Sequence, residues 1–324
     1  MECPRKFFYS YIVGWEKDIP NVHLIFGEAW HRAMEHLTLN GHGAESVNKA
    51  FEKFDSYYTK EMSKKPENAT SIFGHDIADA PVVDTSKKNS NTALMGLVKY
   101  VKTFPEDAKH NVLHTEVSGK VPVADDRFVH FRLDTILETE EGILTLDHKT
   151  GSKFSMSWAA KWELSLQMAT YIHVLYTVFP FEKVYGAKIN GAFFTAKDVS
   201  FERVPVRKTK DMLTAWLAQI NYYIDMIQWN TEKLLEEDNE EKSYMESFPM
   251  NTQSCTNYGL CPFHGMCTSW SNPLRKIKTI PIGFKEKRWD PTKREVIDLE
   301  KKVRTEMIDG KLVQIEVVTE VENA

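Results

Sequence analysis

Three consecutive stretches of alternating apolar and polar residues, directly after His110, most constrain what this chain can fold into. They read VLHTEVSGKVPV, FVHFRLDTILET and GILTLDHKTG, and turn-forming residues separate them at 124–126 and 141–142. Alternation with a period of two is typical of β-strands, and short polar turns join antiparallel neighbours. The sequence therefore predicts a three-stranded meander near the middle of the chain.

Segments with helical spacing surround this meander. The front third predicts helices over residues 24–39 and about 44–62, then a polar loop containing Pro66 and Pro81, and a helix that ends near Phe104. The stretch WAAKWELSLQMATYIHVLYTVF predicts a helix with Trp158 and Trp162 on the same face as residues 166, 169 and 172. Two further strands are expected in 185–196 and 199–206, followed by a long helix over about 209–235.

The composition narrows the class of protein. With 42% hydrophobic and 27% charged residues, the chain resembles a globular protein rather than a disordered or membrane protein. No apolar run approaches the roughly 20 residues that span a bilayer. The N-terminal residues lack the pattern of a secretory signal, so we expect a cytoplasmic protein without membrane contact. The net charge of -5 argues against a global basic field, so any contact with nucleic acid must be local.

Two aspartates and a lysine carry the most informative pattern. Asp134 lies on the second predicted strand, and Asp147 lies on the third, two residues before Lys149. Residues two apart on a strand project to the same face, so His148 points the other way. Paired carboxylates are costly unless they share a cation such as Mg²⁺ or Mn²⁺, and a neighbouring lysine suits phosphodiester hydrolysis. A bare D-x-K pattern is more often structural, with strand-end acids and a lysine that opens a polar turn.

Four other residues are candidates for the same site, and each also has an ordinary structural explanation. Gln167 and Tyr171 share one face of a helix through their i,i+4 spacing, although Tyr171 could equally be core. His31, beside Trp30, is often the kind of histidine that is packed or exposed without a ligand. Glu116 on the first strand could equally be a solvated acid.

The cysteines form a second candidate site. All four cysteines of the chain lie in two places, at Cys3 and at Cys255, Cys261 and Cys267, where the spacing is C-x5-C-x5-C. Disulfides are unusual inside a cell, and zinc sites more often use C-x2-C pairs. The set therefore favours an iron-sulfur cluster, with four unrelated buried thiols as the alternative.

The order of these motifs resembles the RecB-type nuclease domain of the PD-(D/E)XK superfamily, from Cys3 to Cys267. The resemblance implies an α/β restriction-endonuclease-like core with a mixed central sheet flanked by helices and a helical insertion at about 40–109. It also implies roles for the site residues: His31, Asp134, Asp147 and the carbonyl of His148 as metal ligands, Lys149 as the catalytic lysine, and Gln167 and Tyr171 as residues that contact DNA or orient the catalytic groups. Glu116 is a further candidate.

The cysteines resemble the iron-sulfur staple of the AddB nuclease domain, exonuclease V and the CRISPR-associated adaptation nucleases. This resemblance implies a 4Fe-4S cluster on Cys3, Cys255, Cys261 and Cys267, with residues 255–267 as the cluster loop. The nuclease domain is then expected over residues 1–283, and 284–324 form a charged extension in which KLVQIEVVTEVENA is a lone strand or a tail. Because the chain begins two residues before Cys3, we expect a truncated or unusually short form of the domain.

These observations predict a Mg²⁺- or Mn²⁺-dependent DNA nuclease, acting as an exonuclease on single-stranded ends. A helicase or a CRISPR adaptation protein is the partner that the resemblance implies. The alternative is a non-catalytic DNA-binding or scaffold subunit of a helicase–nuclease complex. A cluster-dependent oxidoreductase lacks any nucleotide-cofactor fingerprint.

Overall fold

The computed structural model describes residues 2–64, 85–236, 242–257, 259–288, 303–308 and 310–316. The predicted loop with Pro66 and Pro81 lies outside these residues. The described residues separate into two compact units. We call those within Pro20–Lys64, Val83–Leu217 and Glu295–Ala324 the sheet unit, and those within Met1–Ile19 and Ala218–Arg294 the cysteine unit.

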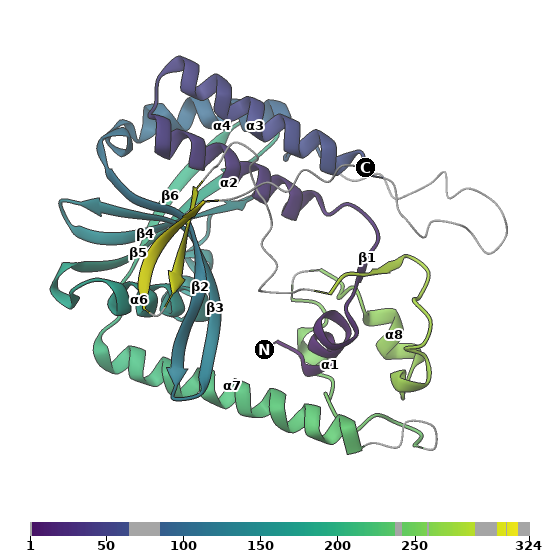
Figure 1. Ribbon diagram of the computed structural model, residues 1–324. Coiled ribbons are helices and arrows are strands. Elements are labelled where there is room, and N and C mark those ends of the chain that lie inside the picture. Colours follow the sequence, from purple (N-terminus) through teal and green to yellow (C-terminus); the bar gives the residue numbers. More distant parts are fainter. Residues whose placement is uncertain are drawn as a thin grey trace. The chain divides into compact units, whose positions relative to one another are not determined.

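A seven-stranded sheet forms the centre of the sheet unit, with the strand order β6-β5-β4-β3-β2-β8-β9 (Figure 1). Neighbouring strands run antiparallel except in the β4–β5 and β2–β8 pairs, so the sheet is mixed, as predicted. The predicted meander is present as β2, β3 and β4. The strands span β2 (Asn111–Ala124), β3 (Arg127–Thr139), β4 (Gly142–Gly151), β5 (Val184–Phe194), β6 (Val199–Val206), β8 (Val303–Ile308) and β9 (Lys311–Glu316).

Helices cover both faces of this sheet. Figure 1 shows α2 (Val22–Asn40), α3 (Ala44–Met62) and α4 (Ser90–Thr103) on one side, and α6 (Leu166–Val178) on the other. The Asn21 side chain begins α2 by accepting hydrogen bonds from two backbone N–H groups of the first turn. Phe26, Trp30, Phe54 and Phe194 are fully buried between the first group of helices and the sheet. The three predicted front helices are therefore confirmed.

The predicted helix from Trp158 onward is wrong in one respect, because it is two helices. The first, α5, spans Met156–Glu163, and α6 begins after Ser165. The Ser165 hydroxyl accepts a hydrogen bond from the backbone N–H of Met168 at 3.3 Å, which caps a new helix. The apolar spacing continues through the break, so periodicity alone could not show it.

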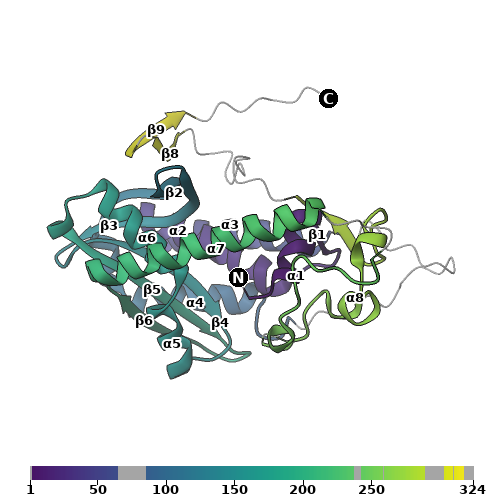
Figure 2. The ribbon, with the colours of Figure 1, turned by 90° about the horizontal axis from the view of Figure 1, so that it is seen from below.

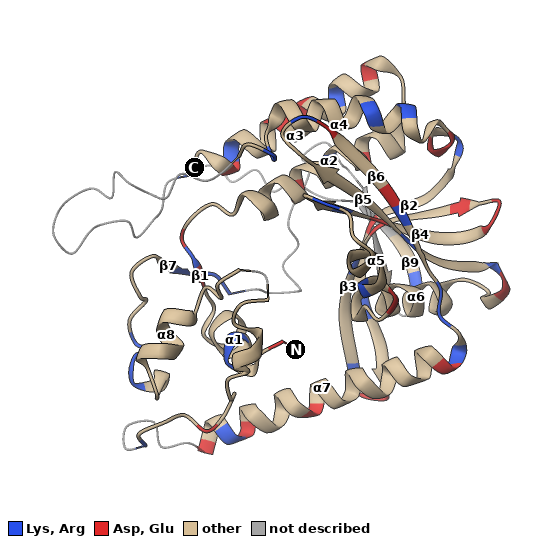
Figure 3. Ribbon diagram, turned by 180° about the vertical axis from the view of Figure 1, so that it is seen from behind, with Lys and Arg blue, Asp and Glu red and all other residues tan. Residues whose placement is uncertain are grey.

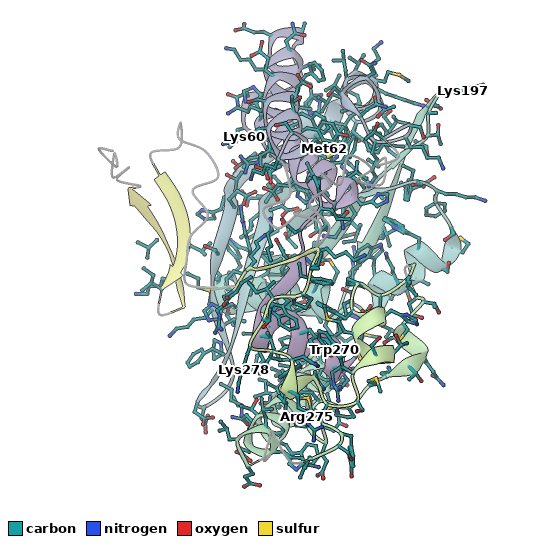
Figure 4. The ribbon with its side chains drawn as sticks, turned by 90° about the vertical axis from the view of Figure 1, so that its right-hand side faces the viewer. Lys60, Met62, Lys197, Trp270, Arg275 and Lys278 are labelled. Atoms are coloured by element: carbon teal, nitrogen blue, oxygen red, sulfur yellow. The ribbon has the colours of Figure 1, made fainter. Side chains whose placement is uncertain are left out.

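The cysteine unit is built around aromatic residues. Its elements are α1 (Pro4–Phe7), the π-helical η1 (Phe8–Val13), α8 (His264–Ser269), and the two-stranded pair β1 (Trp15–Lys17) and β7 (Phe284–Glu286). Tyr9, Phe248 and Phe263 are buried in its core. Trp270, Arg275 and Lys278, labelled in Figure 4, belong to the segment between α8 and β7. The helix α7 (Lys210–Glu236) contributes residues to both units.

The described part of the C-terminal extension differs from the expected lone strand or tail. Residues 311–316 form β9, which pairs antiparallel with β8, and β8 pairs with β2 (Figure 2). The extension therefore adds a hairpin to the edge of the sheet, and its pairing partner lies too far away in sequence for local pattern to reveal. Within the described residues, no helix is long and apolar enough to cross a membrane.

Candidate active site

Asp134 and Asp147 lie where β3 and β4 stop pairing. The last β3–β4 pair is Thr135 with Leu146, and β4 then continues against β5 alone. Beyond that pair, the backbone N–H of His148 donates to Asp134 Oδ2 at 3.2 Å instead of to a strand carbonyl. The end of the ladder therefore turns a carboxylate, rather than backbone, toward the catalytic candidates on β4.

His31 reaches the same carboxylate from α2. Its Nδ1 lies 2.9 Å from Asp134 Oδ2. Burial favours neutral forms of both groups, but their mutual attraction outweighs it: the pKa of His31 is raised to about 9, and the pKa of Asp134 is held well below its usual range. The structure thus brings together two residues that lie about a hundred positions apart in the sequence.

Asp147 and Lys149 form an ion pair on one face of β4. The Lys149 Nζ lies 2.9 Å from Oδ1 and 2.6 Å from Oδ2 of Asp147, as alternation along the strand predicts. Asp147 is 1% exposed, and burial raises its pKa to about 6, with Asp134 adding repulsion and Lys149 opposing the shift. Two neighbouring buried acids therefore differ in their affinity for protons, and both are electrostatically suited to a cation.

Gln167 and Tyr171 approach this group from α6. Gln167 Nε2 donates to the Tyr171 hydroxyl at 2.8 Å. Tyr171 is buried, and its pKa is raised first by burial and then by the negative charges of Asp147 and Asp134. Tyr171 thus lies within electrostatic reach of both acids, and Gln167 contacts the tyrosine.

Glu116 enters from β2, opposite Asp134. Its neighbours Thr115 and Val117 pair with the residues that flank Asp134 on β3. Its backbone has a positive φ of 52°, a conformation that non-glycine residues seldom adopt and that often marks a functional position. Arg132 Nε donates to Glu116 Oε2 at 2.7 Å, so this acid lies near the site with its own cation.

His148 faces the opposite side of β4 and joins a buried polar network that sequence reasoning missed. Its Nδ1 accepts from Asn190 Nδ2 at 3.0 Å, and Arg203 Nε donates to Asn190 Oδ1 at 3.3 Å. Arg203 also donates to Asp107, in the 3-10 turn η2 (Pro105–Lys109), and Tyr100 donates to the same carboxylate at 2.5 Å. Burial lowers the pKa of His148 to about 3, so its ring is neutral.

The helix α5 forms a second feature that the sequence did not reveal. Gly191 on β5 pairs with Lys149, and a Cβ there would lie 2.6 Å from the ring of Trp158. The missing side chain lets α5 pack directly on the sheet beside the lysine. The Lys149 Nζ lies 5.8 Å from the centre of the Trp162 ring. A glycine opposite a candidate catalytic residue is the signal that could have identified this contact.

A comparison with protein families adds to this geometry. Residues 1–268 match the PD-(D/E)XK nuclease superfamily. The chain belongs to that superfamily. A comparison with curated protein sequences found no match. Membership in the PD-(D/E)XK superfamily implies a metal-dependent nuclease with DNA as its substrate.

PD-(D/E)XK nucleases use divalent metal ions such as Mg²⁺ or Mn²⁺. The oxygen-rich pair Asp134 and Asp147 fits such hard cations, with His31 and the His148 carbonyl as further donors. In the part of the chain that the structure describes, no group of three or more His, Cys, Asp or Glu side chains is arranged to hold a metal ion. This holds for the four cysteines as well as for the acids, whose carboxylates are in contact with His31 and Lys149.

The four cysteines of this PD-(D/E)XK protein all belong to the cysteine unit, and none forms a disulfide. Burial raises the pKa of Cys267 to about 11, and Cys3, Cys261 and Cys255 raise it further, so the thiols lie near enough to influence one another. The backbone N–H of Asn251 donates to Cys3 Sγ at 3.3 Å. Cys3 and the three C-terminal cysteines thus lie in one unit and influence one another electrostatically, while the cluster that they are expected to hold stays a prediction.

Arg5 fixes the N-terminal segment in this arrangement. It is 2% exposed, and its Nε donates to the Phe248 carbonyl at 2.9 Å. Its Nη1 is buried without a hydrogen-bond partner in the described structure, and its charge lowers the pKa of Cys267. A buried guanidinium with a spare donor beside several thiols suits a negatively charged occupant.

Proposed function

We propose that the protein hydrolyses phosphodiester bonds of DNA as an exonuclease on single-stranded ends. The end of the β3–β4 ladder carries this proposal, because it gathers Asp134, Asp147 and Lys149 on adjacent strands. His31 on α2 and the Gln167–Tyr171 pair on α6 approach the same place from two helices. A structural ion pair would not need six such residues from four elements.

The site residues would divide the work between holding a cation and acting on the substrate. A divalent ion held by Asp134, Asp147, His31 and the His148 carbonyl would supply positive charge to the phosphate and make water a better nucleophile. Lys149, which now contacts Asp147, would turn its ammonium toward charge that develops on the phosphate. The Tyr171 hydroxyl and Gln167 would orient these groups rather than exchange protons, since the pKa of Tyr171 is raised.

End-labelled single-stranded and duplex DNA would test the proposal with Mg²⁺, Mn²⁺ or EDTA present. We expect stepwise shortening of single strands that depends on either metal. Asp147→Ala should abolish hydrolysis and metal binding, whereas Asp198→Asn, which removes an exposed acid paired with Lys99, should do neither. Internal cuts would show that the protein is an endonuclease rather than an exonuclease. DNA binding without hydrolysis would favour the non-catalytic scaffold.

We also propose that Cys3, Cys255, Cys261 and Cys267 hold a 4Fe-4S cluster. Four thiolates are the usual ligands of this cluster, whose net negative charge matches the buried Arg5 beside Cys267. The cluster would join the N-terminal segment to the loop at 255–267 and so contribute to the stability of the fold.

Iron and sulfide analysis of anaerobically purified protein would test this cluster. We expect brown protein, and loss of colour and solubility in Cys261→Ala. Thr268→Ala on α8, whose hydroxyl donates only to backbone carbonyls of the same helix, is the control and should keep both. Colourless protein with stoichiometric zinc would contradict the iron-sulfur assignment.

A further inference from the structure

Two lysines share one tryptophan at the edge of the candidate active site. The Nζ of Lys161 lies 4.4 Å from the centre of the Trp162 ring, and Lys149 approaches the same ring. Trp162 is buried, and the positive charge of Lys149 acts on Lys161 beside the same indole. The position of Lys161 on α5 is therefore tied to the candidate catalytic lysine.

The charge of Lys161 has no acidic partner among the described residues, whereas Lys149 is paired with Asp147. The pKa of Lys161 is lowered by partial burial and then by the positive charge of Lys149. Like charges that are held together favour an anion between or beside them. Lys and Arg positions are scattered among Asp and Glu positions along the ribbon of the sheet unit (Figure 3).

Leu164 lies three residues after Lys161, at the position that ends α5. Its side chain is 87% exposed, the largest value among the described large apolar residues. An exposed leucine beside an unpaired lysine matches a ligand that combines a negative charge with an apolar surface. A nucleotide of an unpaired strand has both, because its base face is open, whereas a duplex hides its base faces in the stack.

We propose that Lys161 and Leu164 form a binding subsite for the nucleotide next to the scissile bond of a single-stranded nucleic acid. Lys161 binds the phosphate of that nucleotide, and Leu164 contacts its base. The proposal rests on the nuclease function proposed above and adds the residues that would hold the nucleotide beside the cleaved phosphate. The Lys149 side of the site then receives the phosphate that is cleaved, and α5 receives its neighbour.

Salt-dependent binding tests the phosphate contact directly. Fluorescence anisotropy would follow a labelled single-stranded oligothymidylate, with Ca²⁺ in place of Mg²⁺, over a range of salt concentrations. Because one phosphate contact releases its counterion, Lys161→Ala should weaken binding severalfold and reduce the slope of log affinity against log salt by about 0.7. Lys161→Arg should restore the slope. Leu164→Ala should weaken single-strand binding more than binding of the matching duplex.

Lys49→Ala is the matched control, since it removes the same charge from an exposed lysine paired with Glu45 on α3. If Lys161→Ala and Lys49→Ala have the same salt slope, the phosphate contact is refuted. The phosphate contact would also be refuted if Lys161→Ala lowered the hydrolysis rates of the oligonucleotide and of bis(p-nitrophenyl) phosphate by the same factor, because the small substrate lacks the neighbouring phosphate. If wild type shows the predicted binding but cleaves no oligonucleotide in Mg²⁺ or Mn²⁺, the nuclease proposal fails, and Lys161 and Leu164 remain only a single-strand binding site without a scissile bond beside it.

Discussion

The two faces of β4 use similar polar residues in opposite ways. On one face, Asp147 and Lys149 contact chiefly each other, and the lysine is still partly exposed. On the other face, His148 and Thr150 are each held by a residue from elsewhere in the chain: Asn190 Nδ2 donates to His148 Nδ1, and Lys88 Nζ donates to Thr150 Oγ1. We call the face of Asp147 and Lys149 the reactive face, because its groups can change partners. The face of His148 and Thr150 is the supporting face, because its groups cannot.

This difference shows how a strand can carry reactive groups without being displaced by them. Repulsion between Asp134 and Asp147 would push β3 and β4 apart if nothing else fixed them. The chain from His148 through Asn190 to Arg203 ties β4 to β5 and β6 on the reverse side. A catalytic group needs a position accurate to a fraction of an ångström, which such supporting contacts provide.

Removing the lysine from the reactive face should have the largest effect. Lys149→Ala is expected to lower the rate of DNA hydrolysis on the order of a hundredfold to a thousandfold, because its charge acts on the transition state. Single-strand affinity should change little, since that contact matters least in the ground state. Single-turnover rates and anisotropy measure the two effects. Lys99→Ala is the control, and a wild-type rate in Lys149→Ala would refute the assignment.

Sequence reasoning predicted the reactive face better than the supporting one. Alternation along a strand showed that Asp147 and Lys149 share a side, and the structure places their charged atoms in contact. Nothing in the local pattern could show that Arg203, on β6, reaches Asp107 in the turn after α4. Such contacts depend on how elements distant in the chain are packed, and no single residue type or spacing indicates them.

Breaking the supporting network should cost stability before it costs chemistry. Arg203→Met would leave the buried Asp107 carboxylate without its cation, and the free energy of unfolding should fall by about 3 kcal/mol. Adding Asp107→Leu to that variant should recover part of the lost stability, because the buried carboxylate without a cation is then removed. Urea denaturation measures both. If the double variant is the less stable of the two, the buried carboxylate is not the cause.

Lys88 donates a hydrogen bond to Thr150 on the supporting face of β4, but the burial of its ammonium group destabilises the fold. It is 4% exposed, and burial lowers its pKa from about 10.5 to about 8. The unfolded chain therefore binds this proton more tightly, so the penalty is present in full below pH 8 and is relieved as pH rises from about 8 toward 10.5.

Lys88→Met should consequently stabilise the fold at neutral pH. The gain is expected to be up to about 3 kcal/mol at pH 7, reduced by the lost hydrogen bond to Thr150, and smaller at pH 9.5. Urea denaturation at the two pH values gives the difference. A gain that does not depend on pH would show that packing, rather than the buried charge, sets the stability of this variant.

A methyl group at Gly191 tests the reactive face with the smallest change. Gly191→Ala places a Cβ where the Trp158 ring now lies, 2.6 Å from the ideal position, so α5 must move away from Lys149. We expect a loss of about 1–3 kcal/mol in unfolding free energy, typical of overpacking, together with a shift in tryptophan fluorescence and weaker single-strand binding. Gly43→Ala, where the added Cβ meets nothing within 4 Å, should leave fluorescence and binding close to wild type and lose no more than about 1 kcal/mol, because Gly43 caps α3. If Gly191→Ala behaves like Gly43→Ala, α5 is not held against the sheet by this contact, and the lysine pair on Trp162 would need another anchor.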